Sequence, residues 1–151
     1  MNIISNMIEV HLFRRDKKKI EFLILKRAKD QVYPNIWQMV TGKIKENETA
    51  KEAAIREIKE ETGFLPISMW VVPNVNSFYS PQKDEICLIP VLLAEVENIS
   101  KVVISDEHSN YRWVNYKKAK SLFAWPGQKR SLEIIDEYLT KKKSLLKFVR
   151  I

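Results

Sequence analysis

The 151-residue sequence has very little cysteine and no long apolar run. Its single cysteine, Cys87, excludes a disulfide scaffold and is typical of a reducing compartment. No run approaches the roughly 18 apolar residues of a membrane span, and residues 1–15 lack a long apolar signal segment. We therefore expect a cytoplasmic protein with no membrane partner. With 45% hydrophobic and 30% charged residues, the chain can bury a full core, and we expect one domain over residues 1–151.

The charge of the chain is concentrated near its C-terminus. In total, 26 Lys and Arg residues against 19 Asp and Glu residues give a net charge of +7. Residues 112–151 carry 11 basic and 3 acidic side chains, whereas residues 1–111 carry 15 and 16. Such a basic segment either binds a polyanion or forms a solvated surface that keeps the protein in solution. We favour the solvated surface, and nucleic acid stays open as an alternative partner.

Hydrophobic patterning predicts a mixed α/β fold. Strands are expected at residues 7–15, 20–26, 37–41, 69–75, 85–97 and 111–114. The first two are expected to form a hairpin, and Pro90 is expected to mark an edge or a bulge. Helices are expected at residues 49–62, 116–123 and 128–146. Gly63 should end the first of them.

The first expected helix carries a cluster of carboxylates. At about 100° per residue, Glu57, Glu60 and Glu61 fall within an arc of roughly 100°. Oxygen ligands grouped in this way suit Mg²⁺ or Mn²⁺, which would offset the repulsion between the carboxylates. Arg56 is expected to pair with Glu52 and Glu60 through i,i+4 spacing. The alternative is an ordinary surface helix with many ion pairs, and the residues alone leave both interpretations open.

Residues 42–64 read GKIKENETAKEAAIREIKEETGF. The spacing of the Gly, Glu, Arg-Glu-Ile, Glu-Glu and Gly-Phe elements in this segment resembles the Nudix box at every defining position. The resemblance implies an α/β/α sandwich around a mixed sheet. It also implies hydrolysis of a nucleoside diphosphate linked to another group, with Mg²⁺ as the cofactor and Mn²⁺ as a possible substitute.

The resemblance also implies roles for individual residues. The implied metal ligands are the Gly42 carbonyl oxygen, Glu57, Glu60 and Glu61. Glu60, Glu61 and Arg56 are expected to be catalytic, with Arg56 and Glu48 orienting the loop and its ligands. The general base comes either from the box or from a later loop. Our candidate outside the box is Glu107, whose alternative is a solvated loop acid, and Asp106 is its nearest substitute.

Substrate contacts are expected from one arginine and from aromatic residues. Arg27, at the end of the second strand, could bind a phosphate in a bidentate manner, or it could be an ordinary surface arginine. Trp37 and Tyr79 are the expected stacking residues, although aromatic side chains are more often part of a core. Phe78, Tyr111 and Trp125 are further aromatic candidates. His11 and His108 have no metal-ligand partner at a recognisable spacing.

Two further segments are similar to the dATP or dihydroneopterin triphosphate pyrophosphohydrolase group of the family. They are WQMVTG at residues 37–42 and EHSNYRW at residues 107–113. This similarity implies cleavage of a nucleoside or pterin triphosphate to the monophosphate and pyrophosphate. The alternatives are hydrolysis of dinucleoside polyphosphates, ADP-ribose or RNA 5′ ends, and a nucleotide sensor without activity. A sensor would be expected to have lost carboxylates, but all are present. The sequence leaves both a monomer and a homodimer open.

Overall fold

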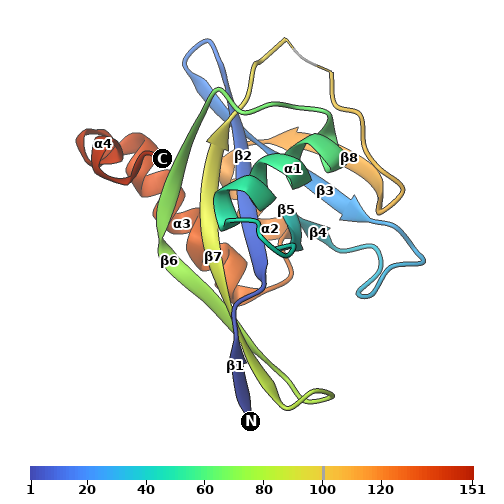
Figure 1. The fold of residues 1–151 in the computed structure, drawn as a ribbon. Coiled ribbons are helices and arrows are strands. Elements are labelled where there is room, and N and C mark those ends of the chain that lie inside the picture. The colour runs from blue at the N-terminus through green and yellow to red at the C-terminus, as the bar shows by residue number, and fades with distance from the viewer. Residues whose placement is uncertain (100) are drawn as a thin grey trace.

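The computed structural model describes residues 1–99 and 101–151 (Figure 1). The strands are β1 (Asn2–Ile4), β2 (Met7–Asp16), β3 (Lys19–Arg27), β4 (Trp37–Gln38), β5 (Val40–Lys43), β6 (Ser68–Ser80), β7 (Glu85–Glu95) and β8 (His108–Val114). The helices are α1 (Ala50–Thr62), α2 (Tyr116–Leu122), α3 (Pro126–Thr140), the 3-10 helix η1 (Lys143–Leu145) and α4 (Leu146–Val149).

The described strands form one mixed sheet with β2 near its centre. β2 pairs with β7 in parallel, and it pairs antiparallel with β5 through Met7–Val10 and with β3 through Leu12–Asp16. β3 then continues alongside β4 and β8. The segment of residues 37–43 therefore pairs first with β3, as β4, and then with β2, as β5. It does so beyond the stretch in which β2 and β3 pair with each other. This pairing brings the end of β5 next to the helix that follows it.

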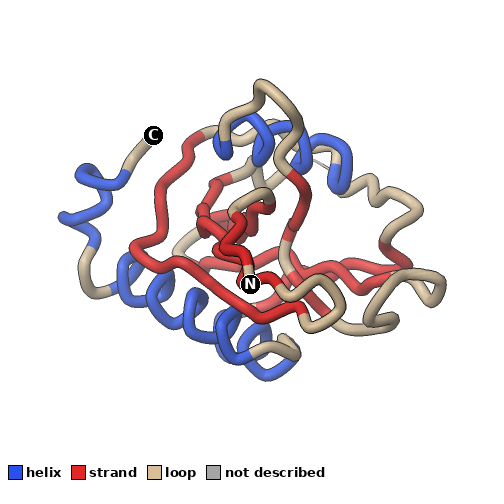
Figure 2. The backbone as a smooth tube through the Cα atoms, turned by 60° about the horizontal axis from the view of Figure 1, so that its bottom comes forward, coloured by secondary structure: helices blue, strands red, loops and turns tan. Residues whose placement is uncertain are grey.

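The side chains of β2 alternate between two cores on opposite faces of the sheet. Ile8, Val10 and Leu12 pack with Ala53, Ala54 and Ile58 of α1. On the other face, Phe13 packs with residues of α2 and α3, including Ala119, Leu132, Ile135 and Leu139. Figure 2 shows helices on both sides of the strands. The expected α/β/α sandwich around a mixed sheet is confirmed.

Both ends of α1 are fixed by local chemistry. Thr49 caps the N-terminus by accepting from the Glu52 backbone N–H, and the Glu52 side chain accepts in turn from the Thr49 backbone N–H. At the C-terminus, Gly63 has a φ of 79°, a left-handed conformation that glycine adopts without strain. The predicted helix and its glycine stop are confirmed.

Several boundaries differ from those expected. β1 was not predicted, because a three-residue strand carries almost no periodic pattern. β6 continues to Ser80 rather than ending at residue 75, and the predicted C-terminal helix stops at Thr140 rather than at residue 146. The lysines at 141–143 are exposed and give this helix no further buried position. After them, η1 and α4 bring Leu146 and Val149 back onto the core of α2 and α3.

Pro90 lies at an irregularity of the sheet, in agreement with the sequence. The pairing of β6 with β7 shifts register between Val71 and Val75, and Val75 is the residue opposite Pro90. Along its other edge, β7 pairs with β1 through Cys87 and with β2 from Val91 onward, so Pro90 falls between these two partners. A residue without an N–H is tolerated at such a gap.

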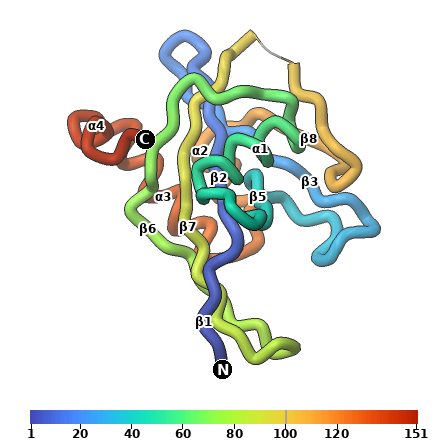
Figure 3. Tube along the Cα trace, in the orientation of Figure 1, coloured from blue at the N-terminus to red at the C-terminus, as the bar shows by residue number. Residues whose placement is uncertain are grey.

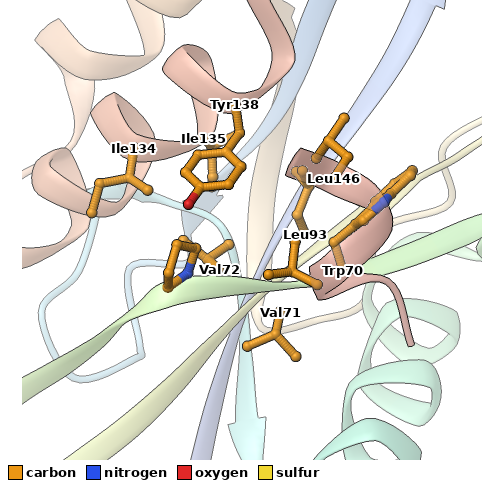
Figure 4. Close-up of a pocket in the computed structure, with 10 residues that line it drawn as sticks. Trp70, Val71, Val72, Leu93, Ile134, Ile135, Tyr138 and Leu146 are labelled. Carbon is orange, nitrogen blue, oxygen red and sulfur yellow. The ribbon is translucent and has the colours of Figure 1, made fainter. Parts of the chain in front are cut away.

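One small cavity lies between β6, α3 and α4 (Figure 4). Its volume is about 10 Å³, and its lining includes Trp70, Leu93, Ile135 and Leu146. An apolar space of this size barely admits one water molecule, so it is a packing gap and not a substrate site. Among the described residues, no helix is long and apolar enough to cross a membrane.

Candidate active site

Arg56 on α1 is the centre of an ion-pair network that ties the preceding loop to the helix. Its Nε and Nη2 atoms donate to the two carboxylate oxygens of Glu48 at 2.7 and 2.9 Å. Its Nη1 atom donates to Glu57 at 2.6 Å and to Glu60 at 3.3 Å. Nη2 also donates to the Lys43 carbonyl oxygen at 2.8 Å. The hydrogen bond from Arg56 lowers the pKa of Glu48 to about 2, so this pair stays ionised across the ordinary pH range.

The expected pair between Arg56 and Glu52 is not formed, and that prediction is wrong. The Glu52 carboxylate is held at the helix N-terminus, where it accepts from the Thr49 backbone N–H at 2.8 Å and the Thr49 hydroxyl at 2.9 Å. A Thr followed three residues later by Glu is the sequence signal of this capping arrangement, and it outweighs the i,i+4 pairing rule. The guanidinium is therefore left for Glu48, Glu57 and Glu60.

Glu61 is buried at the C-terminal end of α1, with 2% of the residue exposed. Neither of its carboxylate oxygens has a hydrogen-bond partner of good geometry among the described residues. Burial raises the pKa of Glu61 well above its ordinary value, and the nearby charges of Glu57 and Glu107 raise it further. The Thr41 backbone N–H and the charge of Arg27 oppose this rise without cancelling it. A buried carboxylate with so little hydrogen bonding is costly, so this position favours a cationic ligand.

Glu57 lies one helical turn before Glu61, and its side chain is only 12% exposed. Burial raises the pKa of Glu57, and the contact with Arg56 opposes this rise. Glu60 differs from both, because 53% of its side chain is exposed. The three carboxylates thus form a graded set, from the buried Glu61 through Glu57 to the solvated Glu60.

The ends of β3 and β8 bring two more charged residues to this region. The backbone N–H of Ala28, directly after Arg27, donates to the Glu107 carbonyl oxygen at 2.9 Å. The charge of Glu107 acts on both Glu57 and Glu61, and the charge of Arg27 acts on Glu61. Acids from α1 and from the loop before β8 therefore meet at one end of the sheet, with an arginine beside them.

This set of acids at a strand–loop–helix junction agrees with the result of a family comparison. A model of the NUDIX domain matches residues 7–137. The chain belongs to the Nudix family. The family and the enzyme class expected from residues 42–64 are thus confirmed.

Named relatives and solved structures agree with this assignment. The chain is 31% identical to the dihydroneopterin triphosphate diphosphatase of Haemophilus influenzae, over 89% of this chain and 87% of that protein. It is 28% identical to the mouse bis(5'-nucleosyl)-tetraphosphatase [asymmetrical], over 85% of this chain and 90% of that protein. Its fold is similar to that of a C. elegans Ap4A hydrolase binary complex, with a TM-score of 0.78 and 23% identity, covering 91% of this chain and 98% of that one.

The Nudix site also includes a buried polar pair that sequence reasoning did not assign. The side-chain nitrogens Nε2 of Gln38 and Nε2 of His108 are 3.2 Å apart. Burial and the neighbouring charge of Arg27 lower the pKa of His108 to about 4, so the ring is neutral and accepts from the amide. The other ring nitrogen, Nδ1, is buried without a partner among the described residues. The sequence signal was that Gln38 and His108 lie in the two segments, residues 37–42 and 107–113, that are similar to one group of the family.

Arg27 is partly committed to the loop that follows it. Its Nε atom donates to the Val32 carbonyl oxygen at 2.6 Å. Its backbone N–H donates to the Ile36 carbonyl oxygen at 2.9 Å, which closes the base of the same loop. The side chain is thus oriented toward this loop, while its charge still acts on Glu61. Its role in phosphate binding stays a prediction.

The aromatic candidates lie in different parts of the molecule. Trp37 packs against the core of α2 and α3, and the Arg112 guanidinium lies 5.9 Å from its ring centroid. Tyr79 lies on the hairpin of β6 and β7, where its hydroxyl donates to Asp84 at 3.0 Å. These positions do not bring Trp37 and Tyr79 together in one site. Their substrate contacts stay predictions.

Basic residues near the C-terminus lie on the other layer of the Nudix sandwich. Lys117 and Lys120 of α2 line an open depression together with Lys129 of α3. Lys120 is paired with Glu133 at 2.8 Å. Because α1 covers the opposite face of the sheet, this basic surface is separated from the carboxylates. The lysines of α2 and α3 therefore do not contribute to the site that the carboxylates of α1 form.

The residues of the Nudix box fit a divalent cation, the cofactor type that the family generally uses. Glu61 offers two buried oxygens that have no hydrogen bond of good geometry from the described residues, and Glu57 lies beside it. Carboxylate oxygens are the donors that Mg²⁺ prefers. Within residues 1–99 and 101–151, no three acidic, histidine or cysteine side chains are already grouped closely enough to hold a metal ion. In this structure the Glu57 carboxylate accepts a hydrogen bond from Arg56.

Gly42 is required by close packing, and we expect the Gly42→Ala variant to lose activity. A Cβ atom at this position would overlap the Glu57 side chain, whose carboxyl end lies directly over β5. Because the clash is with the end of a flexible side chain, Glu57 should move aside at a cost of about 1 kcal/mol. We expect kcat/KM to fall at least tenfold while Tm changes by only a few degrees. The matched control is Lys43→Ala, and full activity of Gly42→Ala would contradict the argument.

Proposed function

We propose that this Nudix protein hydrolyses a nucleoside or pterin triphosphate to the monophosphate and pyrophosphate, with Mg²⁺ as its cofactor. The observation that carries the proposal is Glu61, whose buried oxygens have no hydrogen-bond partner of good geometry among the described residues and lie beside Glu57 at the end of β5. The choice of a triphosphate is supported by the 31% identity to a dihydroneopterin triphosphate diphosphatase over 89% of the chain.

The chemistry requires charge neutralisation on the phosphate oxygens, an activated water and an in-line approach. A divalent cation supplies the charge neutralisation when it is bound. Glu57, Glu60, Glu61 and the Gly42 carbonyl oxygen would hold it. Arg56 would hold the loop before α1 in place through its hydrogen bonds to Glu48 and the Lys43 carbonyl oxygen. Through its hydrogen bond to Glu57 it would also fix the position of that carboxylate.

The water must lose a proton to a carboxylate. Two candidates remain, one of the box carboxylates and Glu107. Glu107 acts electrostatically on both Glu57 and Glu61, so it lies within reach of the same region. Arg27 would meet the phosphate chain from the end of β3, where its charge acts on Glu61.

Hydrolysis of a dinucleoside polyphosphate is the second candidate. The 28% identity to the mouse bis(5'-nucleosyl)-tetraphosphatase over 85% of the chain favours it. Both reactions would use the same carboxylates, because each cleaves a phosphoanhydride bond. The two candidates differ only in the groups attached to the phosphate chain.

A substrate panel should separate these reactions. Purified protein with Mg²⁺ is offered dATP, dihydroneopterin triphosphate, ADP-ribose, Ap4A and 5′-triphosphorylated RNA, and kcat/KM is measured for each. We expect the highest value for one of the two small triphosphates, with pyrophosphate as the released product. Preference for Ap4A or ADP-ribose would refute the proposed substrate class, and preference for the RNA would do the same.

A further inference from the structure

The segment that includes β6 is uncharged along its whole length. No residue from 62 to 82 is acidic or basic, although 30% of the chain is charged. β6 pairs with β7 only on one side, and beyond the bridge between Trp70 and Arg150 its outer edge has no strand partner among the described residues. Charged side chains, prolines and bulges protect edge strands from further pairing. β6 has no charged side chain, and its proline and its bulge both lie between Val71 and Val75. The stretch from Val75 to Ser80 therefore lacks such protection and is open to pairing with a further strand.

Apolar side chains on this part of the sheet are exposed. The exposed fractions are 69% for Ile3, 40% for Val71, 60% for Val75, 53% for Tyr79 and 38% for Leu88. We call these five residues the apolar strip. Figures 1 and 3 show that β1 and the hairpin of β6 and β7 project together away from the helices. α3 and α4 pack on β6, so this part of the sheet is uncovered only on the face that points away from these two helices.

The register places the strip on one face. Ile86, Leu88, Pro90 and Leu92 alternate along β7, and strand residues that pair directly share a face. Val71 pairs with Leu92, Val75 with Pro90, and Ile3 and Tyr79 with Ile86. Leu92 belongs to the core beneath α1, so the strip continues the α1 face of the sheet. α1 itself packs on β2 and β5 and does not extend over the strip.

The charge distribution identifies the partner. Two copies with a net charge of +7 each repel one another, but residues 112–151 carry the whole surplus. The lysines of α2 and α3 lie on the opposite face of the sheet from the strip. Arg150 borders the β6 edge only at its start, where it bridges Trp70 and donates to Ser68. Two copies that meet through Val75 to Ser80 keep these basic residues apart. An anionic membrane or a nucleic acid would instead be attracted to the lysine face.

We propose that the apolar strip and the outer edge of β6 form a symmetric interface with a second copy of this chain. A free strand edge is self-complementary about a two-fold axis, because an antiparallel copy offers the matching N–H and carbonyl groups. An uncharged edge combined with an exposed apolar face is suited to such pairing. The interface does not involve the Nudix carboxylates, so this inference is independent of the proposed substrate.

Sedimentation velocity from about 1 to 200 µM protein tests the proposal. The wild-type chain should sediment as a dimer over most of this range. Val75→Glu should raise the dimer dissociation constant at least 100-fold, because it places two carboxylates at the interface, while kcat/KM stays within twofold. Ile3→Glu is a second variant at the edge of the strip. The matched control is Ile99→Glu in the loop after β7, where the isoleucine is 91% exposed but lies outside the strip and the β6 edge.

Cross-linking gives an independent readout. In a Cys87→Ala background, Val75→Cys should form a disulfide-linked dimer on mild oxidation, and Ile99→Cys should not. A wild-type monomer at 200 µM would overturn the proposal, and so would a dimer that both Val75→Glu and Ile3→Glu leave intact. Co-sedimentation of a monomer with phosphatidylglycerol vesicles, lost in Val75→Glu, would assign the strip to a membrane instead. Because hydrolysis is measured separately, a failed interface is distinguishable from a failed substrate assignment.

Discussion

Glu61→Gln should lower kcat by about three orders of magnitude, since loss of a cation ligand costs several kcal/mol of transition-state stabilisation. The same variant should be more stable than the wild-type chain when no metal is bound. The wild-type carboxylate is buried and has no hydrogen bond of good geometry from the described residues, so its charge opposes folding in the absence of a cation. Glutamine keeps the shape of the side chain and removes the charge.

Two measurements check this pair of outcomes. Turnover is measured with saturating Mg²⁺, and thermal unfolding is followed with EDTA and with Mg²⁺. We expect Mg²⁺ to raise Tm of the wild-type chain and to leave Tm of Glu61→Gln almost unchanged. The matched control is Glu46→Gln, which makes the same change at an exposed position in the loop between β5 and α1. Turnover near the wild-type value, or an equal Mg²⁺ effect in both proteins, would remove Glu61 from the cation site.

Arg56→Lys should have the second largest effect, although it preserves the charge. A lysine ammonium cannot reproduce the fork that binds both oxygens of Glu48 and also reaches Glu57 and the Lys43 carbonyl oxygen. We expect the free energy of unfolding to fall by about 2–3 kcal/mol, which lowers Tm by roughly 5–10 °C. We expect kcat to fall about 100-fold, because Glu57 and the loop lose their fixed positions.

Urea unfolding and steady-state kinetics measure both effects. Arg130→Lys is the matched control, because Arg130 is exposed and donates only to Glu133, so this change should cost less than about 0.5 kcal/mol. If Arg56→Lys keeps full turnover but loses stability, Arg56 has a purely structural role. If neither quantity changes, the network is not needed for either.

The local part of the site was predictable from the sequence. A helix, its glycine stop and the spacing of its carboxylates depend on neighbours within a few turns, and residues 42–64 contain them all. Burial of Glu61 was not predictable in this way, because it depends on strands β2 and β5 packing beneath α1. The pair of Gln38 and His108 was missed for a similar reason, since its two residues are 70 positions apart.

The limits of the fold prediction have the same origin. The hairpin of β2 and β3 was predicted from alternation and a charged turn, and it is confirmed. β1 was missed because it is held by parallel pairing with β7, more than 80 residues away. The extension of β6 to Ser80 likewise depends on pairing with β7, although its own sequence contains asparagine and serine.

The close contact between α1 and the sheet restricts how this protein can diverge. Ala53 and Ala54 are fully buried, so any larger side chain there would lift the helix and carry its carboxylates away from β5. By contrast, Tyr33 and Trp125 are exposed and touch at 5.2 Å between ring centroids, on two loops outside the core. Mutational tolerance should therefore be low on the buried face of α1 and high in these loops. A library confined to these loops should therefore leave the hydrolytic residues in place.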